Sequence, residues 1–298
     1  MTLPAGTLLG RRAARTPRTA SDVVAASVAA LRGARAAAMD AGAPEPRAIG
    51  ISAPGPLDPL RGVLLDPPNM DRSLWDYPLS DAIATRLGLP VALERDTQVA
   101  VLAEGMFGAA RELTDYVYLT VSTGIGGAVV SDGRLLRGPD LVAGELGHMT
   151  VEVDGPPCGC GARGHLEAIS SGTAIARAAR EAGLGEVDAI QVAAAEERGD
   201  ERATKIMEQA RQAFAAAVVS IVDIFNPQRV IVGGGIALGQ GDRLLDPARE
   251  QVSNDAFRRQ AQRVQIVAAS LGDDVGLIGS LPLVSLALLG EDRSSTRT

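Results

Sequence analysis

Both histidines and both cysteines of this 298-residue chain lie within eighteen consecutive positions. The four residues are His148, Cys158, Cys160 and His165, and three glycines separate the first cysteine from the second histidine. Imidazole nitrogens and thiolate sulfurs on a short, glycine-containing loop are the ligands that tetrahedral zinc takes in proteins. Two thiolates balance the charge of Zn²⁺ and two neutral imidazoles add none, so such a site could be partly buried without an unpaired charge.

Two alternatives to a metal site are a chance cluster and a disulfide between Cys158 and Cys160. Cysteines one residue apart bridge only with strain, and a reducing compartment would keep them as thiols. Neither alternative explains why every cysteine and histidine lies in this loop. We expect zinc in a structural role, because four protein ligands leave no coordination position for water. Glu145 and Glu167 flank the loop, where their carboxylates would be fixed acceptors for a hydroxyl-rich ligand.

The segment from Gly144 to Glu167, GELGH followed by CGCGARGHLE, resembles the zinc loop of the ROK family of bacterial repressors and sugar kinases. The resemblance implies that His148 binds zinc and also contacts a sugar, and that Glu145 and Glu167 accept hydrogen bonds from sugar hydroxyls. The loop of the family usually has three cysteines and one histidine, and here His165 takes the last ligand position. Histidine is neutral where the usual cysteine is a thiolate, so we expect zinc to bind less tightly here and to be released at a less acidic pH than in the usual loop.

The composition fits a globular protein of two lobes and disfavours several classes. The net charge of −7 and the low aromatic content of 3% argue against a nucleic-acid partner. The one basic cluster contains Arg11, Arg12, Arg15 and Arg18, and we interpret it as part of a solvated strand and turn over residues 6–15. No apolar run reaches membrane-spanning length, and residues 1–20 lack the apolar core of a signal peptide. These features predict a cytoplasmic protein without a membrane partner.

Hydrophobic periodicity predicts strands alternating with helices, which indicates an α/β fold. The expected strands cover 6–15, 47–53, 90–94, 115–122, 229–232 and 264–268, and the expected helices cover 21–39, 79–87, three segments within 171–223, and 274–289. The resemblance covers residues 6–289 and implies a two-lobed actin-like (ribonuclease H-like) ATPase fold with a zinc loop. Its lobes would be residues 1–110 and 111–298, with the last helix packing back on the N-terminal lobe.

Asp96 lies where a strand is expected to end and a helix to begin, a position that stabilises a carboxylate and suits a simple helix cap. The resemblance implies that Asp96 is also the general base that accepts a proton from a sugar hydroxyl, and that Asn69 contacts sugar hydroxyls. Arg95 stands where the family commonly has asparagine. It predicts either an anionic or differently substituted sugar, or an ion pair of Arg95 with Glu94 or Asp96.

Two glycine-rich turns follow expected strands. Such turns let backbone N–H groups approach phosphate oxygens closely, and a turn between a strand and a helix suits the rest of a nucleotide. The resemblance implies phosphate contacts at the first turn and adenosine contacts at the second. The candidate residues are Thr123, Gly124, Gly126 and Gly127 in the first turn and Gly233, Gly234 and Gly235 in the second.

The resemblance implies ATP-dependent phosphorylation of a hexose or N-acylated hexosamine hydroxyl, with magnesium, a structural zinc and a homodimer. The family opens with two strands around an Asp-x-Gly-Gly-Thr turn that nothing before Gly6 matches. We therefore expect an N-terminal lobe without its first strands, poor kinase activity, and an in-frame upstream segment that restores both. The alternative is a non-catalytic sugar-binding or regulatory protein. A repressor is disfavoured because no helix-turn-helix precedes the kinase-like part.

Overall fold

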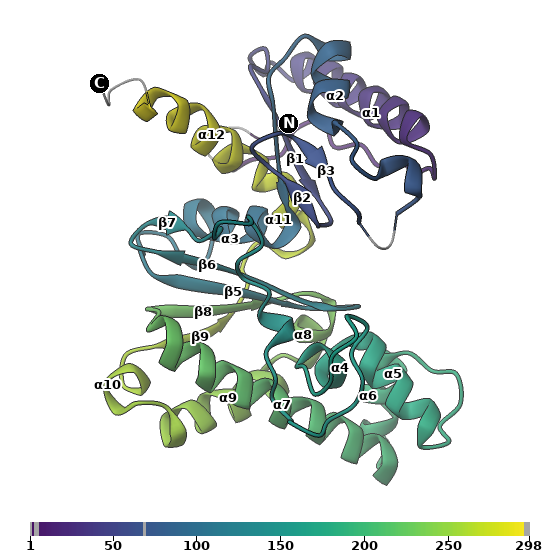
Figure 1. Ribbon diagram of the computed structural model, residues 1–298, viewed down its shortest axis with the longest axis vertical. Helices are drawn as coiled ribbons and strands as arrows, with labels where there is room; N and C mark the ends of the chain where they lie inside the picture. Colours follow the sequence, from purple (N-terminus) through teal and green to yellow (C-terminus); the bar gives the residue numbers. More distant parts are fainter. Residues whose placement is uncertain (1, 3–5, 68–69, 295–298) are drawn as a thin grey trace. The chain divides into compact units, whose positions relative to one another are not determined.

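The computed structural model describes residues 2, 6–67 and 70–294 (Figure 1). The chain forms two compact units, Met1–Gly108 together with Asp273–Thr298, and Ala109–Gly272. The first unit thus combines the beginning and the end of the chain, and the second is one continuous segment.

The first unit is built around two parallel strands, β1 (Ile49–Ala53) and β4 (Val91–Arg95). Its core joins apolar residues of these strands to those of the helices α1 (Ala20–Asp40) and α2 (Leu79–Leu87). The other elements are β2 (Leu57–Asp58), β3 (Val63–Leu64), η1 (Arg72–Leu74), α3 (Asp96–Phe107), η3 (Gly272–Asp274), α11 (Val275–Ile278) and α12 (Ser280–Ser294). Both α12 and α3 pack against β1.

The second unit contains a five-stranded sheet in the order β7-β6-β5-β8-β9. Strands β5, β8 and β9 run parallel, and β6 and β7 are antiparallel additions at one edge. The strands are β5 (Tyr116–Val121), β6 (Ile125–Ser131), β7 (Arg134–Leu135), β8 (Arg229–Gly233) and β9 (Gln265–Ala268). The longest helix, α7 (Glu201–Phe225), begins at the Asp200 cap, whose carboxylate accepts from two backbone N–H groups.

Helices α7 and α9 (Asp242–Asp255) lie side by side along this sheet (Figure 1) and share one apolar core with it. Phe214 is the largest fully buried side chain of that core. The remaining helical segments of the unit are η2 (Leu146–His148), α4 (Glu167–Ser170), α5 (Gly172–Glu181), α6 (Ala189–Glu197), α8 (Gly235–Gln240) and α10 (Arg258–Ala261). The three helices expected between residues 171 and 223 are confirmed as α5, α6 and α7.

Three sequence predictions are wrong in detail. Residues 6–15 form no strand: only an isolated bridge joins Thr2 to Leu8, and the arginine-rich part has no strand partner within the described chain. Helix α1 is capped two residues earlier than the expected start at Ser21, because the Thr19 hydroxyl accepts from Asp22 N. The last helix is interrupted at Gly279, which packs directly against Val99.

Among the described residues, no helix combines the length and the apolar character needed to cross a bilayer.

Phe214→Ala should lower the free energy of unfolding of the protein by about 3–5 kcal/mol, because it empties a closed part of the core. Ile224→Ala, on the same helix but 66% exposed, is the matched control and should change it by less than about 0.5 kcal/mol. Urea unfolding followed by circular dichroism measures both. Equal losses from the two variants would contradict the packing of α7 described above.

Candidate functional site

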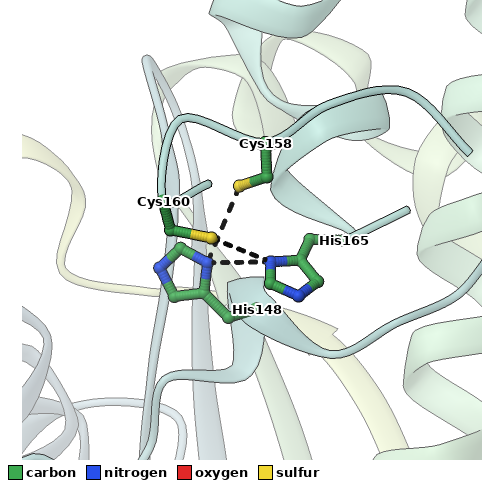
Figure 2. A group of neighbouring side chains, drawn as sticks. All are labelled: His148, Cys158, Cys160 and His165. Atoms are coloured by element: carbon green, nitrogen blue, oxygen red, sulfur yellow. Dashed lines mark hydrogen bonds between the residues drawn. The ribbon is translucent and has the colours of Figure 1, made fainter. Parts of the chain in front are cut away.

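The structure brings the four predicted metal ligands together in the second unit (Figure 2). One ligand atom from each of His148, Cys158, Cys160 and His165 lies within 4.8 Å of all the others. The two Nδ1 atoms are 3.3 Å apart, and sulfur-to-nitrogen distances are 3.4 Å for Cys160 to His165 and 3.8 Å for Cys158 to His148.

These distances fit a zinc ion. Bonds of about 2.0–2.1 Å to nitrogen and 2.3 Å to sulfur, arranged as a tetrahedron, separate two nitrogens by about 3.3 Å and a nitrogen from a sulfur by about 3.5 Å. Burial raises the pKa of the Cys158 thiol, so a thiolate there needs a cation as countercharge. His148, Cys158, Cys160 and His165 would hold zinc as a closed, structural site.

Short backbone pairings hold the ligands in place. Isolated bridges join Thr150 to His165 and Pro157 to Arg163, so the loop folds back on itself as two narrow turns. Gly164 has a φ of +67°, and a Cβ there would lie 1.6 Å from the carbonyl oxygen of Glu152. Only glycine fits at this close approach, which sets the position of the neighbouring His165.

The two glycine-rich turns lie at one edge of the sheet. The first turn joins β5 to β6, where Val121 pairs with Ile125, and the second follows β8, which runs parallel to β5. A Cβ at Gly234 would lie 2.5 Å from the carbonyl oxygen of Val121, so the second turn rests directly against the end of β5. Ligands of open α/β sheets bind at the carboxyl ends of parallel strands, and both turns lie there.

Three contacts to the first turn were not predicted from the sequence. Glu167 Oε2 accepts from Ile125 N at 2.8 Å, and the Thr173 hydroxyl donates to the carbonyl oxygen of Thr123 at 2.9 Å. Gly172 N also donates to the carbonyl oxygen of Ser122 at 2.8 Å. The sequence signals none of these contacts, since the partners lie some forty to fifty positions apart. The beginnings of α4 and α5 therefore fix the turn from one side.

In the first unit, Asp96 is the first residue of α3 and follows β4 directly. Asp96 is therefore not the N-cap that the sequence predicts: Arg95 occupies that position, one residue earlier. Asp96 Oδ1 accepts from Thr97 N at 2.7 Å. Strands β1 and β4 are parallel neighbours, so the turn after Ala53 lies beside Asp96 at one edge. Desolvation raises the pKa of the Asp96 carboxyl; the Thr97 N–H and the Arg95 guanidinium act in the opposite direction.

Arg95 is buried, with only 5% of its surface exposed. Its side chain lies against the turn after β1, where a Cβ at Gly55 would come within 2.9 Å of Arg95 Cδ. With its amide turned to the orientation that satisfies both ends, Gln98 joins Glu94 to Arg95, since its nitrogen then donates to Glu94 Oε1 and its oxygen accepts from Arg95 Nη2. Arg95 is thus held in a buried polar network.

The other candidate residues divide between the two units. Glu145 lies beside the cluster of histidines and cysteines, with its carboxylate oxygen 3.9 Å from His148 Nε2. Asn69 lies outside the described residues. The structure therefore groups Glu145, His148, Glu167 and the glycine turns in the second unit, and Arg95 with Asp96 in the first.

Comparison with known proteins shows to which family this chain belongs. The sequence model described as the ROK family matches residues 5–286. The chain belongs to the ROK family. It is 40% identical over 251 residues to a glucokinase of Thermotoga maritima, covering 79% of this chain and 78% of that protein. It is 37% identical over 216 residues to an N-acetylmannosamine kinase of Citrobacter koseri, covering 72% of each.

Solved structures of ROK proteins share the fold. A ROK hexokinase from Thermus thermophilus superposes with a TM-score of 0.82 at 36% identity, covering 93% of this chain and 90% of that one. A ROK glucokinase from Streptomyces griseus, in complex with glucose and AMPPNP, gives a TM-score of 0.73 at 33% identity, covering 93% and 91%. The predicted α/β fold of the actin-like ATPase kind is confirmed for this ROK protein.

The protein purified without chelator should contain about one zinc per chain, as expected for four converging ligands. Cys160→Ser should remove most of it, because a hydroxyl is a far poorer zinc ligand than a thiolate. Glu152→Gln, an exposed change in the same loop, is the control and should keep the full zinc content. Atomic emission spectrometry measures the metal. Zinc-free wild-type protein, or full zinc in Cys160→Ser, would refute the site.

Proposed function

We propose that this ROK protein transfers the γ-phosphoryl group of ATP to a hydroxyl of a hexose or N-acylated hexosamine. The observation that carries the proposal is the pair of glycine-rich turns at the carboxyl ends of β5 and β8, in a chain related to glucokinases and an N-acetylmannosamine kinase. Phosphoryl transfer requires mainly positioning and charge stabilisation, which backbone N–H groups at such turns supply.

The nucleotide occupies the second unit in this proposal. Backbone groups of the first turn, at Thr123 and Gly124, and of the beginning of β6, at Gly126 and Gly127, contact phosphate oxygens. Gly233, Gly234 and Gly235 contact the adenosine part, since they lead from a strand into a helix at the same edge of the sheet. Magnesium, when bound with ATP, neutralises charge on the phosphates.

Asp96 is the general base. A hydroxyl oxygen of the sugar attacks the γ-phosphorus, Asp96 accepts the hydroxyl proton, and ADP leaves. A raised pKa brings a carboxylate closer to the basicity that proton acceptance near neutral pH requires. The position at the start of α3 keeps the carboxylate oriented, because Thr97 N donates to it.

The sugar is held by carboxylate, amide and imidazole groups, which accept hydrogen bonds from hydroxyls or donate to them. This role belongs to Asn69, Glu145, His148 and Glu167. Zinc, when bound to the loop, would help to hold His148 and the nearby Glu167 in position. Arg95, buried against Gly55 and bonded to Gln98, shapes the sugar side of the site beside Asp96. A cytoplasmic homodimer completes the proposal, in keeping with the family resemblance.

Asp96→Asn should lower kcat for hexose phosphorylation by roughly a hundredfold or more and leave the sugar Kd nearly unchanged, because it removes the base but keeps the hydrogen bonds. Asp81→Asn, at an exposed position of α2, is the matched control. A coupled ADP-release assay with glucose and N-acetylmannosamine measures turnover, and calorimetry measures sugar binding. Retained turnover would exclude Asp96 as the base; no turnover by the wild-type protein, with sugar still bound, would favour a non-catalytic sugar-binding protein.

The pH profile of kcat/KM should fall on its acidic side through a pKa above the ordinary aspartate value of about 3.9, because desolvation raises the pKa of Asp96 and the base acts only when ionised. The residual activity of Asp96→Asn should lack this acidic limb. Steady-state rates in buffers of constant ionic strength test both statements. A limb at or below the ordinary value in wild-type protein would contradict them.

A further inference from the structure

The first glycine-rich turn lies between two pieces of the metal-binding loop. On one side is η2, which ends at the ligand His148. A Cβ at Gly147 would lie 2.0 Å from the carbonyl oxygen of Ile125, and a Cβ at Gly127 would lie 2.6 Å from Leu146 Cδ1. The backbone of η2 therefore rests directly on the first residues of β6.

On the other side is α4, which begins with Glu167. Glu167 Oε2 accepts from Ile125 N at 2.8 Å, and a Cβ at Gly124 would lie 2.7 Å from the same oxygen. Ile125 is buried, so its N–H has a carboxylate rather than solvent as its partner. Leaving such a donor unpaired in a buried position is costly.

The metal ligands tie these two pieces together. His165 precedes Glu167 by two residues, His148 closes η2, and their Nδ1 atoms are 3.3 Å apart. Leu166 N also donates to the carbonyl oxygen of Met149 at 2.9 Å. A metal held by both histidines would thus fix the distance between η2 and α4, and so the space that the turn occupies.

We propose that Glu167 is a positioning residue for the first glycine-rich turn. Through its hydrogen bond to Ile125, a well-ordered metal-binding loop also keeps the nucleotide site ordered. The proposal rests on the proposed function, since it takes this turn to bind nucleotide phosphates. Glu167 Oε2 holds the Ile125 N–H, and Oε1 is the oxygen left for a sugar hydroxyl. One carboxylate then organises both substrates' sites within the second unit.

Glutamine and methionine at position 167 separate the two roles. The amide oxygen of Glu167→Gln can still accept from Ile125 N, whereas Glu167→Met keeps the length of the side chain but has no comparable acceptor. Glu152→Met, exposed in the same loop, is the matched control. Amide hydrogen exchange of residues 122–131 in ligand-free protein, and calorimetry with Mg-ADP, are the two readouts, and circular dichroism checks folding.

Glu167→Met should accelerate exchange of the 122–131 segment and weaken Mg-ADP binding by roughly tenfold. Glu167→Gln should stay within about twofold of wild type on both readouts, since it retains the hydrogen bond. Removing the metal with a chelator should accelerate exchange of the same segment. If Glu167→Met does not fold, Gly124→Ala tests the same contact by exchange, because its methyl group must displace the Glu167 carboxylate.

Wild-type exchange and Mg-ADP affinity in Glu167→Met would overturn the inference and leave the proposed function intact. Equal loss of Mg-ADP binding in Glu167→Gln and Glu167→Met would also overturn it, because the negative charge rather than the hydrogen bond would then matter. Failure of the wild-type protein to bind Mg-ADP would refute both the nucleotide site and the positioning role.

Discussion

The parallel register of β5 and β8 is the constraint on which the candidate nucleotide site depends. It places Thr120 opposite Gly233, so the turn after each strand leaves the sheet at the same level. Gly234 then meets the carbonyl oxygen of Val121 at a distance that no side chain would allow. The two glycine turns, more than a hundred residues apart in the chain, become one surface because the strands that carry them share hydrogen bonds.

The metal loop extends this surface by packing backbone against backbone. Leu146 and Leu166 join the core of the second unit, but helices of three and four residues are not stable alone. Ligation by His148 and His165 would therefore add order that the local sequence lacks, as structural zinc does elsewhere. A metal without an open coordination position would in this way still affect the candidate phosphate site.

Residue types predicted much of the site, and long-range contacts limited the rest. Cysteine and histidine placement predicted the cluster, and glycines after alternating strands predicted both turns, because these signals are local. The hydrogen bond of Glu167 to Ile125 spans 42 positions and has no local pattern. The expected strand at residues 6–15 is wrong for a related reason: a strand needs a neighbour to pair with, and propensity alone does not identify one. The stop at Gly279 depends likewise on contact with Val99.

Arg95, which departs from the pattern of the family, is part of a buried network with Glu94 and Gln98. Glu94 and Gln98 are fully buried beside it, and the Gln98 amide bonds both charged side chains. A buried ion left without its partner is strongly destabilising, typically by about 3–5 kcal/mol, so the identities of residues 94, 95 and 98 are energetically linked. The arginine also packs where Gly55 leaves room for it. Arg95 therefore fills the space beside the turn after β1 and places a positive charge beside Asp96, and an asparagine there would remove that charge from the buried network of Glu94 and Gln98.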